Sequence, residues 1–217
     1  AVLFIHGGPI PREMTPPTQW GAFISYGELA AAYGLAGVVF NHRLHALTDY
    51  PIAQDDIEAA IEYVRKNADD LGISDDRLAV WVFSGGGPLL ARFVRDCPAF
   101  VRCLAAFYAI LDLRHVIPPN ADAAQVAGME LFSPAAHVPG SLTRVPLLLA
   151  RAGLDAPAVN DSIDSFVRAA LSGNTMIECL NHPAGHHAFD LLDDDDRSRE
   201  IIKRAMEFVQ SHLSTDS

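Results

Sequence analysis

Short apolar runs alternate along the chain with amphipathic stretches. The runs are rich in Val, Leu, Ile and Phe, and Gly, Pro or charged residues bound them. Most are continuously apolar rather than alternating, which is typical of strands buried on both faces of a parallel sheet. We predict six strands, at Val2–Ile5, Gly37–Asn41, Leu78–Phe83, Val101–Tyr108, Val145–Arg151 and Met176–Leu180.

The stretches between these runs carry apolar residues at helical spacing. In Asp55–Ala68, for example, Ile57, Ile61 and Val64 would share one face, with polar residues between them. We predict helices at Tyr26–Tyr33, Asp55–Ala68, Leu89–Arg95, Ser162–Leu171 and, near the C-terminus, around Ile201, Ala205, Phe208 and Val209. This alternation predicts an α/β fold, a mostly parallel sheet with helices on both faces.

The 217 residues suffice for one domain with a single sizeable core, so we predict one domain over 1–217. Leu113–Thr143 is rich in Pro, Ala and Gly and interrupts the strand–helix alternation. We interpret 113–143 as a small cap-like insertion rather than a second domain. Because the chain opens at Ala1, already inside an apolar run, we expect that a segment precedes it.

Composition and charge restrict the partners. Half of the residues are apolar, and the net charge is −11. This negative charge argues against binding to nucleic acid or to an anionic membrane, because phosphate groups would repel it. No stretch has the length of a membrane span, no signal peptide opens the chain, and the three scattered cysteines suggest reduced thiols. We expect a cytoplasmic protein; its oligomeric state stays open, a homodimer included.

A glycine-rich turn follows the third predicted strand. Ser84-Gly85-Gly86-Gly87-Pro88 leads from Leu78–Phe83 into a helix. A serine at such a turn has a strained backbone and an exposed hydroxyl, and it needs small neighbours two positions away. Gly86 meets that demand and Val82 does not. A phosphate-binding loop would need Lys-Ser or Lys-Thr after the glycines, which is absent. We predict Ser84 as a nucleophile, with a plain structural turn as the alternative.

A second glycine loop, His6-Gly7-Gly8-Pro9, follows the first strand. Acyl transfer needs backbone N–H groups that stabilise the oxyanion of the tetrahedral intermediate. We expect one from Gly85 and one from Gly8, with Ile10 as the alternative, because Pro9 has no N–H. We expect His6 to hold the loop in place rather than to act as a base.

Carboxylates and histidines after later strands could complete a catalytic site. Asp155 follows Val145–Arg151, while Asp112 follows an earlier strand and is its main rival. Asp161 and Asp164 should lie on a helix and face solvent. The loop after Met176–Leu180 holds His182, His186 and His187. Pro183 and Gly185 break any helix that would align two of them on one face, as a zinc-binding helix requires, so we expect no metal. The chain order serine, aspartate, histidine is that of Ser-Asp-His hydrolases.

Together these motifs resemble the α/β-hydrolases of the esterase/lipase and dienelactone-hydrolase-like group, over nearly the whole chain. The resemblance rests on His6-Gly7-Gly8, Ser84-Gly85-Gly86, Asp155 and His187-Ala188-Phe189. It implies that His187 is the base, because the catalytic histidine of that group commonly stands in an H-G-F or H-A-F context. It also implies that Asp155 is the acid, and that two further strands precede the one at Ala1.

The resemblance implies a serine carboxylesterase without a cofactor, acting through an acyl-enzyme intermediate. Because the insertion is short, we expect small or short-chain esters as substrates. Trp20 and Phe132 could line the pocket or belong to the core. Two alternatives stay open: a peptidase of the prolyl-oligopeptidase type, which shares the H-G-G-P loop, and a catalytically silent small-molecule binder.

Overall fold

The six strands form one parallel sheet. The computed structural model describes residues 1–116, 122–138 and 145–214. The strands are β1 (Val2–Ile5), β2 (Gly37–Val39), β3 (Leu78–Phe83), β4 (Val101–Phe107), β5 (Leu147–Ala152) and β6 (Ile177–His182). They lie in the order β2-β1-β3-β4-β5-β6, and every neighbouring pair is parallel. The predicted parallel α/β architecture is confirmed.

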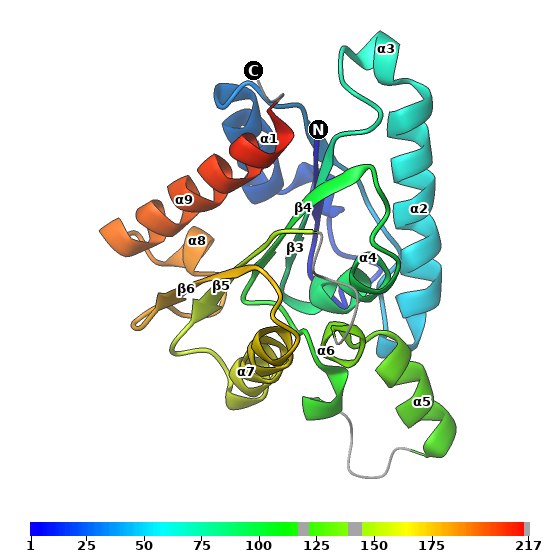
Figure 1. Ribbon diagram of the computed structural model, residues 1–217, viewed down its shortest axis with the longest axis vertical. Helices are drawn as coiled ribbons and strands as arrows, with labels where there is room; N and C mark the ends of the chain where they lie inside the picture. The colour runs from blue at the N-terminus through cyan, green and yellow to red at the C-terminus, as the bar shows by residue number, and fades with distance from the viewer. Residues whose placement is uncertain (117–121, 139–144, 215–217) are drawn as a thin grey trace.

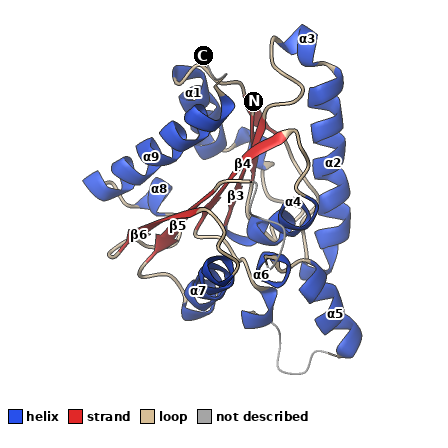
Figure 2. Cartoon of the chain, viewed as in Figure 1, coloured by secondary structure: helices blue, strands red, loops and turns tan. Residues whose placement is uncertain are grey.

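Helices cover both faces of this sheet (Figures 1 and 2). One face packs against α2 (Tyr50–Lys66), α4 (Ala91–Asp96), α6 (Pro134–His137) and α7 (Pro157–Ser172). The other packs against α1 (Gly21–Ala32) and α9 (Asp196–Leu213). The short helices α3 (Ala68–Leu71), α5 (Ala123–Leu131) and α8 (Phe189–Leu192) complete the set among the described residues.

The sequence of strand β3 is apolar throughout because the strand is covered on both faces. Leu78, Val80 and Val82 belong to the core under α2 and α4. Ala79, Trp81 and Phe83 belong to the core under α1 and α9. Successive side chains point to opposite faces of a strand, so a strand covered on both sides needs apolar residues at every position. All six residues of β3 are buried.

Several predicted boundaries were wrong by a few residues. Helix α2 begins at Tyr50 rather than Asp55, with Pro51 in its first turn, where its missing N–H costs nothing. Helices α1 and α7 also begin five residues earlier than predicted, and α4 begins two residues later because a 3₁₀ segment, Ser84–Leu90, precedes it.

Strand ends also differ from the predictions. β2 ends at Val39 rather than Asn41, and β4 ends at Phe107, because Tyr108 takes a positive φ of 38°. β5 lies at Leu147–Ala152 instead of 145–151. β6 continues past Leu180 to His182, paired with β5 as far as Ala152. The sequence pattern does not show where β6 ends, because polar residues are tolerated on an edge strand whose outer side faces solvent.

The predicted insertion at 113–143 is described only in part, and residues 117–121 and 139–143 lie outside the described residues. Its described elements are a 3₁₀ turn at Leu113–His115 and the helices α5 and α6. Helix α6 packs against α4 and α7, the 3₁₀ turn packs against α7, and α5 packs against the 3₁₀ turn. Phe132 packs against the core there and stacks on Tyr50, with 5.6 Å between ring centroids.

The acidic run Asp193–Asp196 leads into helix α9. Asp195 is the N-cap residue, and its carboxylate accepts a hydrogen bond of 2.7 Å from the backbone N–H of Ser198. Negative charge is favourable at this end of a helix because the free N–H groups point toward it.

Candidate active site

Ser84 lies at the carboxyl end of β3, in the sharp turn that leads into the 3₁₀ segment. Its φ is +51°, a conformation that L-residues rarely adopt. The glycines after it are needed for close approach. A Cβ at Gly85 would lie 1.8 Å from the Gly8 carbonyl oxygen, and one at Gly86 would lie 2.6 Å from that of His6. Val82 is accommodated because it points into the core under α2, away from this contact.

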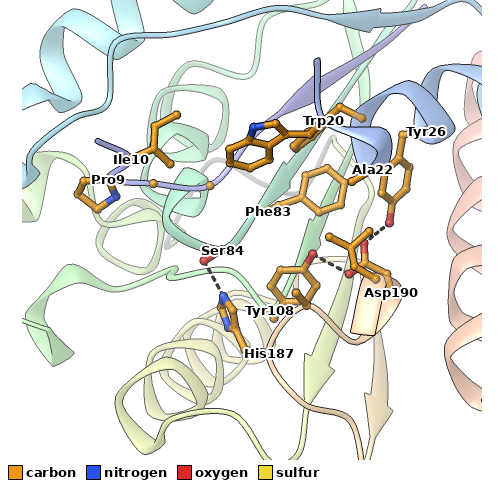
Figure 3. Close-up of a pocket in the computed structure, with 15 residues that line it drawn as sticks. Pro9, Ile10, Trp20, Ala22, Tyr26, Phe83, Ser84, Tyr108, His187 and Asp190 are labelled. Atoms are coloured by element: carbon orange, nitrogen blue, oxygen red, sulfur yellow. Dashed lines mark hydrogen bonds between the residues drawn. The ribbon is translucent and has the colours of Figure 1, made fainter. Parts of the chain in front are cut away.

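Two hydrogen bonds connect Ser84 to a carboxylate. The Ser84 hydroxyl lies 2.8 Å from Nε2 of His187, and Nδ1 of His187 lies 2.7 Å from Oδ2 of Asp155 (Figure 3 shows the first bond). The other oxygen of Asp155 accepts from the N–H of Ala156 at 2.7 Å, which fixes the carboxylate plane. The Asp155 side chain is only 3% exposed. The structure thus brings together three side chains from the ends of β3, β5 and β6.

Asp112, the alternative candidate for the catalytic acid, binds other side chains. It is buried, with 1% exposure, and it accepts bonds of 2.8 and 2.7 Å from the guanidinium of Arg114. The hydroxyl of Ser165 donates to it as well, at 3.0 Å. The Arg114 guanidinium and these hydrogen bonds hold the pKa of Asp112 below its usual value, although burial alone would raise it. Asp112 therefore stabilises the start of the insertion and does not contact His187.

The three histidines after β6 have three different partners. His182 lies within 3.2 Å of Asp195 and 3.1 Å of Ser198, and it is buried. His186 pairs with Asp193 at 3.0 Å on the surface. Only His187 reaches Ser84. Among the described residues, no group of three or more His, Cys, Asp or Glu side chains is arranged to hold a metal ion.

The glycine loop after β1 lies directly beside the Ser84 turn. A Cβ at Gly7 would lie 3.4 Å from the Ser84 hydroxyl oxygen, which shows how near the loop backbone comes to it. The N–H of Ile10 donates to the Leu44 carbonyl at 3.0 Å, so it is not free to bind a substrate oxygen. Within the described structure, the N–H of Gly8 donates to no protein acceptor.

His6 supports this loop through a stacked pair. Its ring lies parallel to that of His42, with 3.6 Å between centroids, and Nε2 of His42 lies 3.1 Å from the His6 carbonyl. Nδ1 of His6 lies 2.7 Å from the Gly7 carbonyl. Burial lowers the pKa of His6 to about 4 and that of His42 to about 3, so both are neutral at pH 7. No pattern in the sequence indicated the pairing of His6 with His42.

A pocket of about 290 Å³ opens beside Ser84 (Figure 3). Fifteen residues line it: Gly7, Gly8, Pro9, Ile10, Trp20, Ala22, Phe23, Tyr26, Phe83, Ser84, Tyr108, His187, Ala188, Asp190 and Leu191. Trp20 is thus a pocket residue, whereas none of the described residues of the insertion contributes to the wall. The start of α1 and the glycine loop enclose the pocket instead.

Sequence reasoning missed a second polar cluster in this pocket. Asp190, in α8, accepts hydrogen bonds from the hydroxyls of Tyr108, at 2.7 Å, and Tyr26. The Tyr108 ring also packs edge-on against His187, with 4.8 Å between centroids. The only signal was the position of Asp190, three residues after the candidate base, and its partners lie 82 and 164 residues away.

Comparisons with known proteins agree with this architecture. An esterase of the planctomycete Thermogutta terrifontis, Est2 with butyrate bound, superposes with a TM-score of 0.78 at 18% identity, over 100% of this chain and 85% of that one. The chain has the α/β-hydrolase fold. A truncated carbohydrate esterase from gut microbiota matches the chain equally well, with a TM-score of 0.78, 18% identity, and coverage of 99% and 86%.

Further comparisons concern the same esterase and a family model. The same Thermogutta esterase has been observed phosphorylated by paraoxon, in a structure with a TM-score of 0.76 at 18% identity, covering 99% and 84%. A family model named BD-FAE matches residues 1–94, the part that holds the glycine loop and the Ser84 turn. No curated protein matches the sequence significantly. None of the helices in the described part of the chain has the length and apolarity that crossing a bilayer requires.

Proposed function

We propose that this α/β-hydrolase is a serine carboxylesterase in which Ser84 is the nucleophile, His187 the base and Asp155 the acid. The observation that carries the proposal is the continuous pair of hydrogen bonds from the Ser84 hydroxyl through both ring nitrogens of His187 to Asp155. A serine, a base in contact with it, and a third group that orients the base are the requirements of nucleophilic acyl transfer.

In the first half-reaction, the Ser84 oxygen attacks the ester carbonyl carbon while Nε2 of His187 takes the hydroxyl proton. The carbonyl oxygen becomes negative, and the N–H groups of Gly85 and Gly8 stabilise it. Asp155 accepts a hydrogen bond from the Nδ1–H of His187 and stabilises the imidazolium without taking up its proton. His187 then protonates the leaving alcohol, and an acyl-enzyme remains. Water, deprotonated by His187, attacks this acyl group and releases the carboxylic acid.

Small or short-chain esters fit the pocket best. Its volume of about 290 Å³ lies at the lower limit for pockets that hold drug-sized ligands. Most of its lining is apolar, including Ile10, Trp20 and Phe83. The structural relative Est2 has been observed with butyrate and with propionate bound, which suggests acyl groups of that size here too.

We keep the single domain and the cap-like role of 113–143 as parts of this proposal. Of the described helices of the insertion, α6 packs against α4 and α7, and α5 packs against the 3₁₀ turn at Leu113–His115. A small-molecule ester as the substrate follows from this chemistry. A cytoplasmic location, a homodimer and the lack of nucleic-acid binding stay predictions.

Labelling and hydrolysis test the proposal together. The wild-type protein should hydrolyse p-nitrophenyl butyrate and react covalently with a fluorophosphonate probe. Ser84→Ala should lose both properties while its circular dichroism spectrum is unchanged. Equal hydrolysis by Ser84→Ala would refute the proposed nucleophile. Release of an aminoacyl chromogenic amide without ester hydrolysis would indicate a peptidase, and ligand binding without labelling would indicate a silent binder.

A further inference from the structure

A partly buried carboxylate, Asp190, lines the same pocket as Ser84 and takes no part in the proposed acyl transfer. Figure 3 shows Asp190 next to Tyr108 and Tyr26, with Tyr108 on the side of the cluster toward His187. All five side chains line the same pocket. Asp190 comes from α8, Tyr108 from the end of β4 and Tyr26 from α1, so the tertiary structure brings them together from distant parts of the chain.

Both hydroxyl protons of this cluster already form hydrogen bonds. Each tyrosine has one hydroxyl proton, and each donates it to Asp190, to different oxygens of the carboxylate. Burial raises the pKa values of Tyr26 and Tyr108 far above the usual value, so both phenols keep these protons. A carboxylate oxygen can accept a second bond, and a phenol oxygen that donates can still accept. This end of the pocket therefore offers acceptors and no donor.

The charge of Asp190 also has no basic partner there. Among the described residues that line the pocket, none is Lys or Arg, and His187 is already bonded to Asp155 and Ser84. Burial raises the pKa of Asp190, against the two tyrosine hydrogen bonds that lower it. A charge in apolar surroundings gains most from a further hydrogen-bond donor, because desolvation has removed its water.

We propose that Asp190, with Tyr26 and Tyr108, is a specificity site that selects esters carrying a hydroxyl or amino group and disfavours esters carrying a carboxylate. The proposal rests on the esterase function proposed above and adds the polarity of its substrate. A hydroxyl or ammonium hydrogen can bond to Asp190 or to either phenol oxygen. A carboxylate finds no donor in the cluster and is repelled by the charge.

Three matched esters test the selection on the alcohol side: n-propyl butyrate, 2-hydroxyethyl butyrate and 2-carboxyethyl butyrate. They differ only in a terminal methyl, hydroxyl or carboxylate group. Ethyl 3-methylbutanoate, ethyl 3-hydroxybutanoate and monoethyl succinate test the acyl side. The kcat/KM of the wild-type enzyme should be about tenfold higher for the hydroxyl ester than for its apolar partner in at least one series, the effect of one hydrogen bond to a charged acceptor. The carboxylate ester should be the poorest substrate of that series.

The variant Asp190→Asn has almost the same shape, but it lacks the charge and introduces two N–H donors. The hydroxyl-to-methyl ratio should fall to about one, and the carboxylate ester should improve relative to the apolar ester. Asp194→Asn is the control: it removes the same charge from a fully exposed carboxylate nearby, with a side-chain exposure of 97%, and should leave every ratio unchanged.

The ratios separate specificity from structural support. If Asp190 only stabilised the fold, Asp190→Asn would slow all esters equally and the ratios would stay constant, which would overturn the proposal. A wild-type enzyme without preference in either series would overturn it too, whether or not the variant folds. Failure of the esterase function is a different result, since neither n-propyl butyrate hydrolysis nor fluorophosphonate labelling of the wild-type protein would then be observed.

Discussion

Replacing Gly85 with alanine tests how closely the two proposed oxyanion donors approach each other. A Cβ at Gly85 would lie 1.8 Å from the oxygen, 2.8 Å from the carbon and 3.1 Å from the nitrogen of Gly8. Real Cβ atoms almost never approach within 3.0 Å of another heavy atom. The two backbones would therefore have to separate by about 1.2 Å, the difference between 3.0 and 1.8 Å. The obstacle is backbone on both sides, so no side-chain rotation can relieve it.

Such a separation moves both N–H groups away from the developing oxyanion. Loss of one oxyanion donor lowers kcat by roughly 100- to 1,000-fold, and a misplacement of about 1 Å alone can cost roughly 100-fold. We expect Gly85→Ala to lower kcat for p-nitrophenyl butyrate in this range, with a smaller effect on KM. The charge that the donors stabilise forms only in the transition state, which is why KM responds less.

Gly128→Ala provides the matched control for the same chemical change. Gly128 lies inside α5, and a Cβ there would meet nothing within 4 Å. This substitution should leave kcat unchanged and raise the free energy of unfolding by about 0.5–1 kcal/mol, because alanine favours the helix. Folding of both variants is checked by circular dichroism. A folded Gly85→Ala enzyme that kept kcat within tenfold of the wild-type value would refute the proposed oxyanion site.

Two further predictions concern the carboxylates and the buried imidazoles. Asp155→Asn should lower kcat by about four orders of magnitude, since the His187 imidazole loses its orienting partner. Asp112→Asn should lower the thermal midpoint of unfolding and have a far smaller effect on kcat. If Asp112→Asn lowered kcat more than Asp155→Asn, Asp112 would be the catalytic acid. Because burial lowers the pKa of His6 to about 4 and that of His42 to about 3 from 6.5, the unfolded chain binds protons below pH 6.5 that the folded chain excludes. The free energy of unfolding in urea should therefore fall between pH 6.5 and pH 4, by about 3 kcal/mol from His6 alone, and level off near pH 3. His42→Phe should flatten this dependence, and an unchanged slope would contradict the assignment.

The sheet could be predicted from the sequence because each of its inner strands is buried on both faces. Leu78–Phe83 needs apolar residues at every position, so its limits are visible in the sequence and match β3. Where burial is one-sided, the pattern fails. β6 continues through Asn181 to His182 at the sheet edge, and α2 begins at Tyr50, five residues before the predicted start. Polar residues are tolerated at both places, so no change of pattern marks the boundary.

The polar pocket residues could not be predicted from the sequence for a different reason. Tyr26, Tyr108 and Asp190 are unremarkable one by one, since tyrosine in a helix or at a strand end is more often part of a core. Their hydrogen bonds join residues 82 and 164 positions apart. The same holds for His42, which stacks on His6 across 36 positions. No local spacing encodes such contacts, because the strand order brings these elements together.

By itself, the sequence determined the α/β class, the turn at Ser84 and the glycine loop at Gly7 and Gly8, because backbone geometry there demands particular residues in immediate succession. Only the tertiary structure decided which carboxylate faces His187. Asp112 and Asp155 both follow strand ends, but the packing of the insertion pairs Asp112 with Arg114 and leaves Asp155 at 2.7 Å from the imidazole. The physical reason is that a hydrogen bond depends on distance in space, and chain order alone does not fix that distance.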